Sequence, residues 1–442
     1  MLETLVATKG IAAMEAQDVQ ALSQLKGEPE WMTQRRLAAW RVFQDTPRPT
    51  TRDEPWRRTD IRRLNLDPVV PASGDARLSD LPARWQAMVG TEDQAGLALH
   101  ADGGNAYVSL EGGLARQGVI FTDMATALRE HGDWVAPFFM HQAVRPTDGY
   151  FAALNGAVWS GGTFLYVPQN VQVELPLQTV TWAGPGAHSF THTLVVVEAG
   201  ARATLVEEFA SQEDKGGAPA VHNGVVELIV NDGAQLDYVN VQDWARDAFN
   251  FSTERAVLAR DATLRWVVGG IGSRLTKRFI DASLLGAGAT ALMSGLFFGD
   301  GRQHLDYDTQ QNHVAPHTSS DLLYKGALKD EARSVWQGMI KVLPGAQKTD
   351  GYQANRNLLL NRSARADSIP GLEIEADDVR CTHGATVSQL DPEELFYVRS
   401  RGLPFEDAQR LIVQGFFAPV IARVPMARVR QRLTDAILKK TG

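Results

Sequence analysis

The middle of the chain is built from short runs of β-branched and other apolar residues. Between about residue 155 and residue 300 these runs follow one another with Gly, Asp or Asn between them, and no ten-residue helical pattern intervenes. Strands without intervening helices indicate an all-β region rather than a βαβ fold. The expected strands span residues 163–167, 171–175, 193–197, 203–207, 225–230, 236–241, 255–258, 264–268 and 292–298.

A small turn residue followed by Ala and a new apolar run recurs through this region. The steps between successive pairs are 33, 28, 27 and 57 residues, the last about twice the others. A period near thirty residues is typical of solenoids, whose coils stack about 4.8 Å apart. The pattern favours a parallel β-solenoid, and a β-sandwich with chance spacing stays the alternative. The pairs are Gly200-Ala201, Gly233-Ala234, Asp261-Ala262, Gly288-Ala289 and Gly345-Ala346.

Helical patterns flank the β region. Near the N-terminus, Pro29 suits a first helical turn, and an apolar stripe from Trp31 to Phe43 stops before Pro47. The sequence therefore predicts a mainly β protein in three parts. These are an N-terminal helical domain at 1–93, a β-helix core at 94–386 with a helical excursion at 123–141, and a C-terminal helical domain at 387–442.

Three helical segments are expected after residue 387. Asp391 has the position of an N-cap, with acidic residues in the first turn behind it. Such helices would cap the end of a solenoid or present a face to a partner. The apolar stripes are Phe405, Ala408, Leu411, Ile412 and Phe416 in residues 404–417, and Val429, Leu433 and Ile437 in the last segment.

Composition narrows the class of protein. The 442 residues are 44% hydrophobic and 22% charged, enough for a large core, and the net charge of −8 argues against nucleic-acid binding. Cys381 is the single cysteine, so no internal disulfide can form. Residues Met1 to Gln17 have no apolar leader pattern, and no apolar run is long enough to span a bilayer. We therefore expect a cytoplasmic protein that is not bound to a membrane.

Common catalytic motifs are missing from the sequence. There is no G-x-S-x-G elbow, no H-E-x-x-H pair and no G-x-x-x-x-G-K-[ST] loop, so we expect no catalytic residues. His304, His313 and His317 lie in one polar stretch, and the last two have the spacing of a helical metal pair. Pro316 between them makes a continuous helix improbable. Structural hydrogen bonding and metal binding both stay open for these histidines.

Cys381 and His383 form a second candidate pair. On an extended chain, residues two apart project to the same side with Cα atoms about 6.6 Å apart. Thiolate and imidazole both suit iron or zinc, but a cluster usually takes four ligands, so the rest would have to come from another chain. A buried thiol beside a hydrogen-bonded imidazole is the structural alternative.

Several motifs in matching order resemble the SufB/SufD family of iron–sulfur cluster assembly proteins. The resemblance covers about residues 140–420 and is weak before them. The motifs lie at residues 337–360 (QGMIKVLPGAQKTDGYQANRNLLL), 368–374 (SIPGLEI), 381–386 (CTHGAT), 395–402 (LFYVRSRG), 151–157 (FAALNGA) and 166–168 (YVP).

The resemblance implies a parallel β-helix between helical domains, acting as a non-catalytic scaffold. It further implies a complex with a SufB-like paralogue through the β-helix, and with the ABC-type ATPase SufC through the C-terminal helices. His383 matches a histidine proposed to bind iron of a nascent cluster shared with SufB. Cys381 matches a cysteine that neighbours this histidine in the family. No cluster is expected to bind stably to the chain alone, and reduced flavin in the complex and a homodimer of the isolated chain stay open.

The sequence leaves two alternatives to this assignment, one within the family and one from another class of protein. SufB-like chains are expected to carry extra cysteines, so the single Cys381 favours the SufD branch over a SufB-like paralogue. A carbohydrate-active β-helix enzyme is the rival from another class, and such enzymes are generally secreted. Co-purification with an ATPase, against activity on polysaccharides, separates the two.

Overall fold

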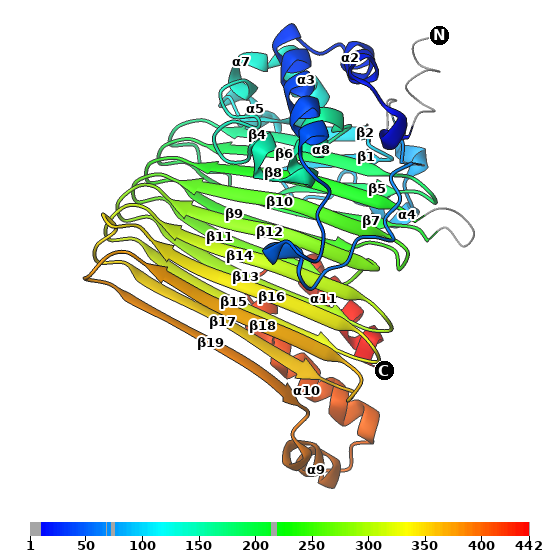
Figure 1. The fold of residues 1–442 in the computed structure, drawn as a ribbon, viewed down its shortest axis with the longest axis vertical. Helices are drawn as coiled ribbons and strands as arrows, with labels where there is room; N and C mark the ends of the chain where they lie inside the picture. Colours follow the sequence, from blue (N-terminus) through cyan, green and yellow to red (C-terminus); the bar gives the residue numbers. More distant parts are fainter. Residues whose placement is uncertain (1–9, 68, 72–75, 214–218, 442) are drawn as a thin grey trace.

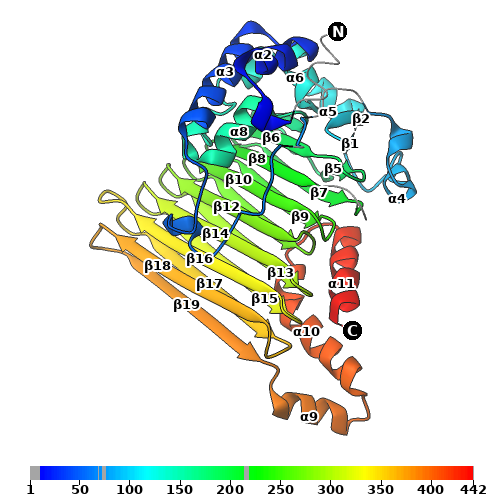
Figure 2. The same ribbon diagram turned by 45° about the vertical axis from the view of Figure 1, so that its right-hand side comes forward.

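The chain folds into a stack of β-coils with helices at its N-terminal end and along one face (Figure 1 and Figure 2). The computed structural model describes residues 10–67, 69–71, 76–213 and 219–441. The first nine residues, for which the sequence predicts no leader, lie outside this description. Within the described part, no helix is long and apolar enough to cross a membrane.

Two sheets form the body of the stack, and the chain passes from one to the other at each half-turn from β4 onward. Sheet A contains β1 (Gly96–Ala101), β2 (Gly104–Leu110), β5 (Leu177–Ala183), β7 (Arg202–Ser211), β9 (Gln235–Asp243), β11 (Thr263–Gly270), β13 (Thr290–Gly299), β15 (Ser319–Leu328), β17 (Asp350–Leu359) and β19 (Arg380–Gln389). Sheet B contains β3 (Ile120–Asp123), β4 (Thr163–Val167), β6 (Ser189–Val197), β8 (Val221–Val230), β10 (Phe249–Leu258), β12 (Leu275–Leu284), β14 (His304–His313), β16 (Arg333–Val342) and β18 (Arg365–Ile374).

The pairing between coils is parallel, which confirms the solenoid and excludes the sandwich. Antiparallel pairs occur at the N-terminal end, between β1 and β2 and between β3 and β4. The expected strand at 171–175 is wrong, since only an isolated bridge at Gln172 occurs there. The sequence did not predict strand β14. Polar residues such as Thr309 and Gln311 occupy its inward positions, and they weaken the alternation of apolar and polar residues.

The turn repeat has a conformational basis. Gly200, Gly233, Asp261 and Gly288 all have positive φ, between 56° and 77°, where small or Asx residues are favoured. His317, with φ 58°, supplies the turn missing from the long step. The expected turn at Gly345 lies between β16 and β17, as the repeat predicts, but the positive φ in that turn is at Lys348, with φ 62°.

The N-terminal part combines helices with a long extended segment. The helix α3 ends before Pro47 as expected, whereas the excursion at 123–141 consists of two short helices instead of one. The elements outside the strands are η1 (Ile11–Ala13), α2 (Ala16–Leu25), α3 (Glu30–Asp45), η2 (Glu54–Trp56), η3 (Leu78–Asp80), α4 (Ala83–Gln86), α5 (Gly112–Arg116), α6 (Met124–Glu130), α7 (Gly132–Val135), η4 (Pro146–Asp148) and α8 (Tyr150–Val158).

Within the expected helical domain at 1–93, residues 46–67 form a largely non-helical strap across the outer face of sheet B, interrupted by the short helix η2 (Figure 2). Trp56 packs between aromatic rings of α8 and sheet B, with Phe151 at 5.6 Å and Phe279 at 6.0 Å. The carbonyl of Pro55 accepts a 2.6 Å hydrogen bond from the buried Lys277. These contacts tie the N-terminal region to the later coils of the solenoid.

Three helices follow the last strand, namely α9 (Pro392–Ser400), α10 (Phe405–Ile421) and α11 (Ala427–Thr441). The Asp391 carboxylate accepts a 2.8 Å bond from the Glu393 N–H, which confirms the expected N-cap. In α11, Val429, Leu433 and Ile437 are buried against sheet A, as their stripe predicts.

The stripe expected in α10 is partly wrong. Its buried face consists of Ala408, Val413, Phe417 and Val420, which pack toward α11 and sheet A, whereas Leu411 is exposed. The helix has apolar residues on two faces, and its position against α11 decides which face is covered.

A polar network occupies the middle of the solenoid interior. Arg278 forms an ion pair of 2.6 Å with Glu254 and donates a 2.9 Å bond to Asn240. Glu207 accepts a 2.7 Å bond from Thr193 and a short bond from Tyr238. Burial raises the pKa of Glu207 to about 7, against the hydrogen bonds that lower it. The network therefore carries a carboxyl group that gains its proton near neutral pH.

This pKa gives a testable stability effect. Because the folded pKa is above the unfolded value of 4.5, wild-type stability should fall as pH rises from about 4.5 to about 7. Glu207→Gln removes the titrating group and should be the more stable form at pH 8, by on the order of 3 kcal/mol, with little difference at pH 4.5. Melting temperatures of both forms across this range test it, and parallel pH profiles would contradict it.

Candidate functional site

The last coil ends the stack with two unpaired strand edges. Among the described residues, strand β18 pairs only with β16 and β19 only with β17, so each ten-residue strand leaves one edge free within this part of the chain (Figure 1). Ile374 and Val387 on these strands are 42% and 45% exposed. Long, exposed edge strands can recruit strands from other chains, so this end is suited to pairing.

Cys381 and His383 lie on this end strand and share the inward-facing row. Cys381 is in register with the buried Gly351 and His383 with the buried Gln353, while the exposed Tyr352 between them faces outward. The structure thus places both side chains on one side of β19, as their spacing predicts. Cys381 is partly buried and His383 is exposed.

The thiol has a mixed environment. Burial raises the pKa of Cys381, while the backbone N–H of Gly351 opposes that shift by hydrogen bonding. Cys381 also packs beside Ile340, Val342 and Ala346. A thiol held this way is neutral at rest and needs a metal or a base to become a thiolate.

A polar layer lies directly behind this pair. His313 at the end of β14 is fully buried, and its ring nitrogens bond Thr318 and Ser320, both at 2.8 Å. Burial lowers the pKa of His313 to about 4. From the sequence, His313 is a candidate metal ligand together with His317. Its position behind Cys381 could not be predicted, because only the stacking of the coils brings β14 near β19.

The remaining histidines of that stretch lie elsewhere. His304 bonds Thr59 of the strap at 2.7 Å on the outer face of sheet B, where burial lowers its pKa to about 4. His317 occupies a turn with φ 58°. The three histidines are therefore not brought together, and no helix joins His313 to His317. Among the described residues, no group of three or more His, Cys, Asp and Glu side chains could hold a metal ion.

A second candidate site is an acidic groove on the outer face of sheet B. It has a volume of about 480 Å³ and is lined by Asp148, Asp281, Asp308 and Glu373. These four carboxylates have cationic partners: Arg255 bonds Asp148 at 2.8 Å and Asp281 at 2.9 Å, and Lys277 bonds Asp308 at 2.9 Å. Lys341 bonds Glu373 at 2.7 Å. Paired carboxylates of this kind do not form the free acid and base of a glycosidase.

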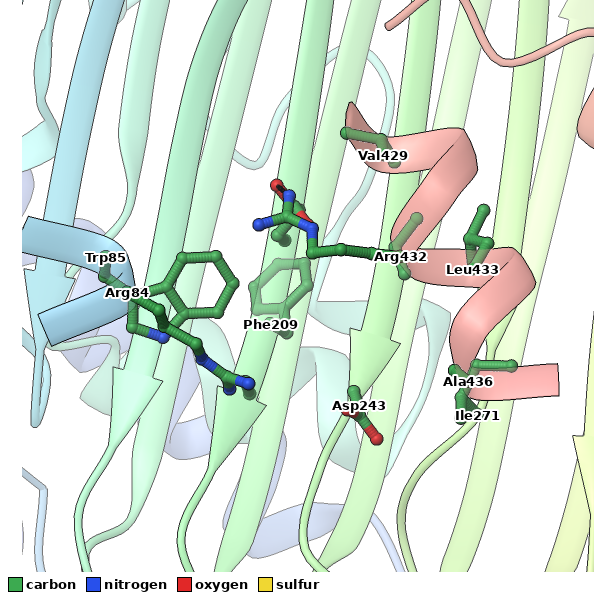
Figure 3. A pocket seen from close by; sticks show the side chains of 12 residues that line it. Arg84, Trp85, Phe209, Asp243, Ile271, Val429, Arg432, Leu433 and Ala436 are labelled. Carbon is green, nitrogen blue, oxygen red and sulfur yellow. Dashed lines mark hydrogen bonds and ion pairs between the residues drawn. The ribbon is translucent and has the colours of Figure 1, made fainter. Parts of the chain in front are cut away.

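A third cavity lies between α11, α4 and sheet A (Figure 3). Its volume is about 60 Å³, well below the roughly 150 Å³ that admits benzene in a protein core. Arg432 reaches across it to pair with Glu208 and lies 5.0 Å from the Trp85 ring. The cavity is a packing defect bridged by an ion pair and is too small for a cofactor.

Comparisons with known proteins point to one family. The model described as "SUF system FeS cluster assembly, SufBD core domain" matches residues 180–416, and the model "SufBD protein N-terminal region" matches residues 105–179. The match to the core model includes Cys381 and His383.

Similar relatives extend over nearly the whole chain. The iron–sulfur cluster assembly protein SufD of Bacillus subtilis (strain 168) is 33% identical over 97% of this chain and 98% of its own length. SufB of the same organism is 31% identical over 92% of this chain and 89% of its own. An iron–sulfur cluster assembly SufBD family protein of Staphylococcus haemolyticus (strain JCSC1435) is 31% identical with the same coverage.

Proposed function

This chain belongs to the SufB/SufD family of iron–sulfur cluster assembly proteins, and from that premise we propose that it is a non-catalytic scaffold subunit. In this proposal it pairs with a SufB-like paralogue and an ABC-type ATPase resembling SufC. The single cysteine supports the SufD branch of the family and a reducing, cytoplasmic location.

The main support for this proposal is the open end of the solenoid, at β18 and β19. It is the one place where the only thiol of the chain and an exposed imidazole share the inward row of an end strand. Two donors are too few for a cluster, which usually takes four ligands, so a second chain must complete the set. The nascent cluster is the cargo of the complex, and the chain alone does not retain it.

The free edges of β18 and β19 support pairing at the same end. A partner strand added to either edge would continue a sheet of the solenoid and cover Ile374 and Val387. A SufB-like β-helix joined in this way would place its own ligands next to His383. A homodimer of the isolated chain would use the same edges.

The ATPase would dock on α9 and the start of α10. Phe396 and Tyr397 are 74% and 59% exposed, and Phe405 at the start of α10 is exposed as well. In contrast, α11 packs against sheet A and holds the C-terminal helices to the solenoid. ATP hydrolysis belongs to the partner, and any reduced flavin belongs to the assembled complex.

Co-expression with SufB-like and SufC-like chains tests the function. Size-exclusion chromatography should show one ternary complex, and chemical analysis should find iron and sulfide in that complex but not in this chain purified alone. Failure of the three chains to co-elute, or equal iron in the isolated chain, would refute the scaffold role.

A further inference from the structure

A cavity runs along the edge of β18 at the open end of the solenoid. Its volume is about 430 Å³, and its lining includes five consecutive residues of β18, residues 365–369. Neighbouring residues of a strand face opposite sides, so a cavity that touches all five follows the edge of the strand rather than one face of the sheet. Ala385 and Val387 of β19 also line it and belong to the same inward row as His383. The cavity therefore lies where a partner chain would pair.

The backbone of β18 offers hydrogen-bonding groups to this cavity. The N–H of Arg365 donates to the carbonyl of Ala332 in the preceding coil. Backbone groups alternate between the two sides of a strand, so those of Ala366 and Ser368 point toward the edge that is free within the described part of the chain. The row of N–H groups on this edge is broken at Pro370, which has none. Backbone pairing is therefore short at this strand, and the side chains beside it have a larger share in recognition.

Arg58 reaches this cavity from the strap, outside the coils. Trp56 and Thr59 on either side of it are buried, and Thr59 bonds His304 at 2.7 Å, so the backbone at Arg58 is held in place. The Arg58 side chain is partly buried, yet among the described residues it has no ion pair and no hydrogen bond. The strap thus holds an uncompensated guanidinium group beside the last coil.

Arginine exceeds carboxylate around the cavity. Asp367 pairs with Arg333 at 2.8 Å and with Arg365 at 3.0 Å. Arg58 adds a third guanidinium, and no second carboxylate lines the cavity in the described part of the chain. The local charge is therefore positive, although the whole chain has a net charge of −8. Guanidinium groups suit a carboxylate, because each offers paired N–H donors in one plane.

The charges along β18 favour an antiparallel partner strand. The strand begins at Arg365, whereas Glu373 lies near its end and Glu375 follows the end directly. Both carboxylates are exposed. A paralogous strand of the same polarity brings its acidic end beside Arg58 and Arg365 when it pairs antiparallel, whereas parallel pairing would bring like charges together.

We propose that Arg58 and Arg365 form a carboxylate-binding subsite for the partner chain, filled by an acidic side chain at the end of the partner strand that pairs with β18. The occupant is a SufB-like paralogue, so the inference rests on the proposed function and deepens it by naming residues that select the partner. The N-terminal strap thereby becomes part of the interface at the last coil. Charge complementarity of this kind contributes to partner selection and to the rate of association.

Calorimetry with a purified SufB-like paralogue, at low and at high salt, tests the subsite. Arg58→Glu should weaken binding about tenfold or more, because a carboxylate at this position repels the acidic side chain. The difference from wild type should shrink at high salt, since salt screens both the attraction and the repulsion. A purely structural role of Arg58 would not produce this salt effect.

The matched control is Arg57→Glu, one residue earlier on the strap, because Arg57 is exposed and does not line the cavity. It should bind within about threefold of wild type, since its charge lies in solvent. Melting temperatures of both variants check their folding. If Arg58→Glu is unstable, Arg58→Gln decides, and it should weaken binding in the same direction by a smaller factor.

The outcomes separate the subsite from the proposed function. Equal affinity of Arg58→Glu and Arg57→Glu, or a loss that salt does not reduce, overturns the subsite even if the ternary complex contains iron. A complex that depends on Arg58 but contains no iron supports the subsite and counts against the scaffold role. A wild-type chain that does not bind the paralogue overturns both.

Sedimentation of the isolated chain tests a second copy as the occupant, because the Glu375 carboxylate of a second copy could reach the same cavity. Self-association that Arg58→Glu abolishes, beside unchanged affinity for the paralogue, overturns the assignment to a SufB-like partner. Loss of paralogue binding in Arg58→Glu, with self-association equal to that of the wild type, supports it.

Discussion

The change His383→Ala is expected to leave the chain folded and the complex assembled but to lower its iron content on the order of tenfold. His383 is exposed on the end strand, so its loss removes a ligand without opening a cavity in the core. The measurement is iron and sulfide per ternary complex isolated from cells, together with the melting temperature of the same preparation.

The matched control is Thr382→Ala, one residue earlier on the opposite face of β19. It should leave iron content and melting temperature unchanged. Cys381→Ser should have a smaller effect on iron than His383→Ala, because burial raises the pKa of the Cys381 thiol and favours its neutral form, whereas His383 is exposed to a partner. A lowered melting temperature of His383→Ala beside normal iron per complex would assign His383 a purely structural role.

The double change Phe396→Ala and Tyr397→Ala should abolish stable binding of the ATPase partner without lowering the melting temperature. Aromatic side chains that become buried at an interface commonly contribute about 2 kcal/mol or more each, a loss of about thirtyfold in affinity for one of them. Both side chains are exposed on α9, and the contact of Tyr397 with Arg401, a 3.2 Å hydrogen bond to its hydroxyl, lies at the surface, so their loss should cost little stability. Calorimetry with the purified ATPase measures the effect.

Leu433→Ala in α11 is the contrasting control. Leu433 is buried against sheet A, and its truncation should cost about 2–5 kcal/mol of stability. Deleting residues 391–442 is a poor test of docking, because removal of α11 would expose the apolar outer face of sheet A. Undiminished ATPase affinity of the Phe396/Tyr397 double variant would exclude α9 as the docking surface.

Much of the fold follows from local pattern. Turn residues at a period near thirty mark the coils, because a tight reversal needs positive φ at each one, as at Gly233 and Gly288. Apolar runs identify β4, β6 to β11 and β13, but they do not mark β1 to β3, β5, β12 or the strands from β14 onward. At β14 the interior itself is polar, and the residues of the strap have no regular period because their partners belong to sheet B.

The sequence alone also indicated the candidate pair, since Cys381 and His383 must share a face on any extended strand. It could not show that the strand closes the stack, that its edge is free, or that the face opens at the end of the interior. Those features depend on how many coils precede β19 and on what covers them. Similarly, an amphipathic helix indicates an apolar face, but only packing decided that α11 is buried while α9 stays exposed.

The approach of His313 to Cys381 depends entirely on tertiary structure. The two residues are 68 positions apart, and neither their types nor their spacing indicates contact. Stacking aligns Ser320, Gly351 and Cys381 in one inward row of sheet A, and His313 reaches that row across the interior from sheet B. Sequence determines the period of the coils and the side to which each residue points. Contacts across the interior depend on how the two sheets pack, which no local pattern contains.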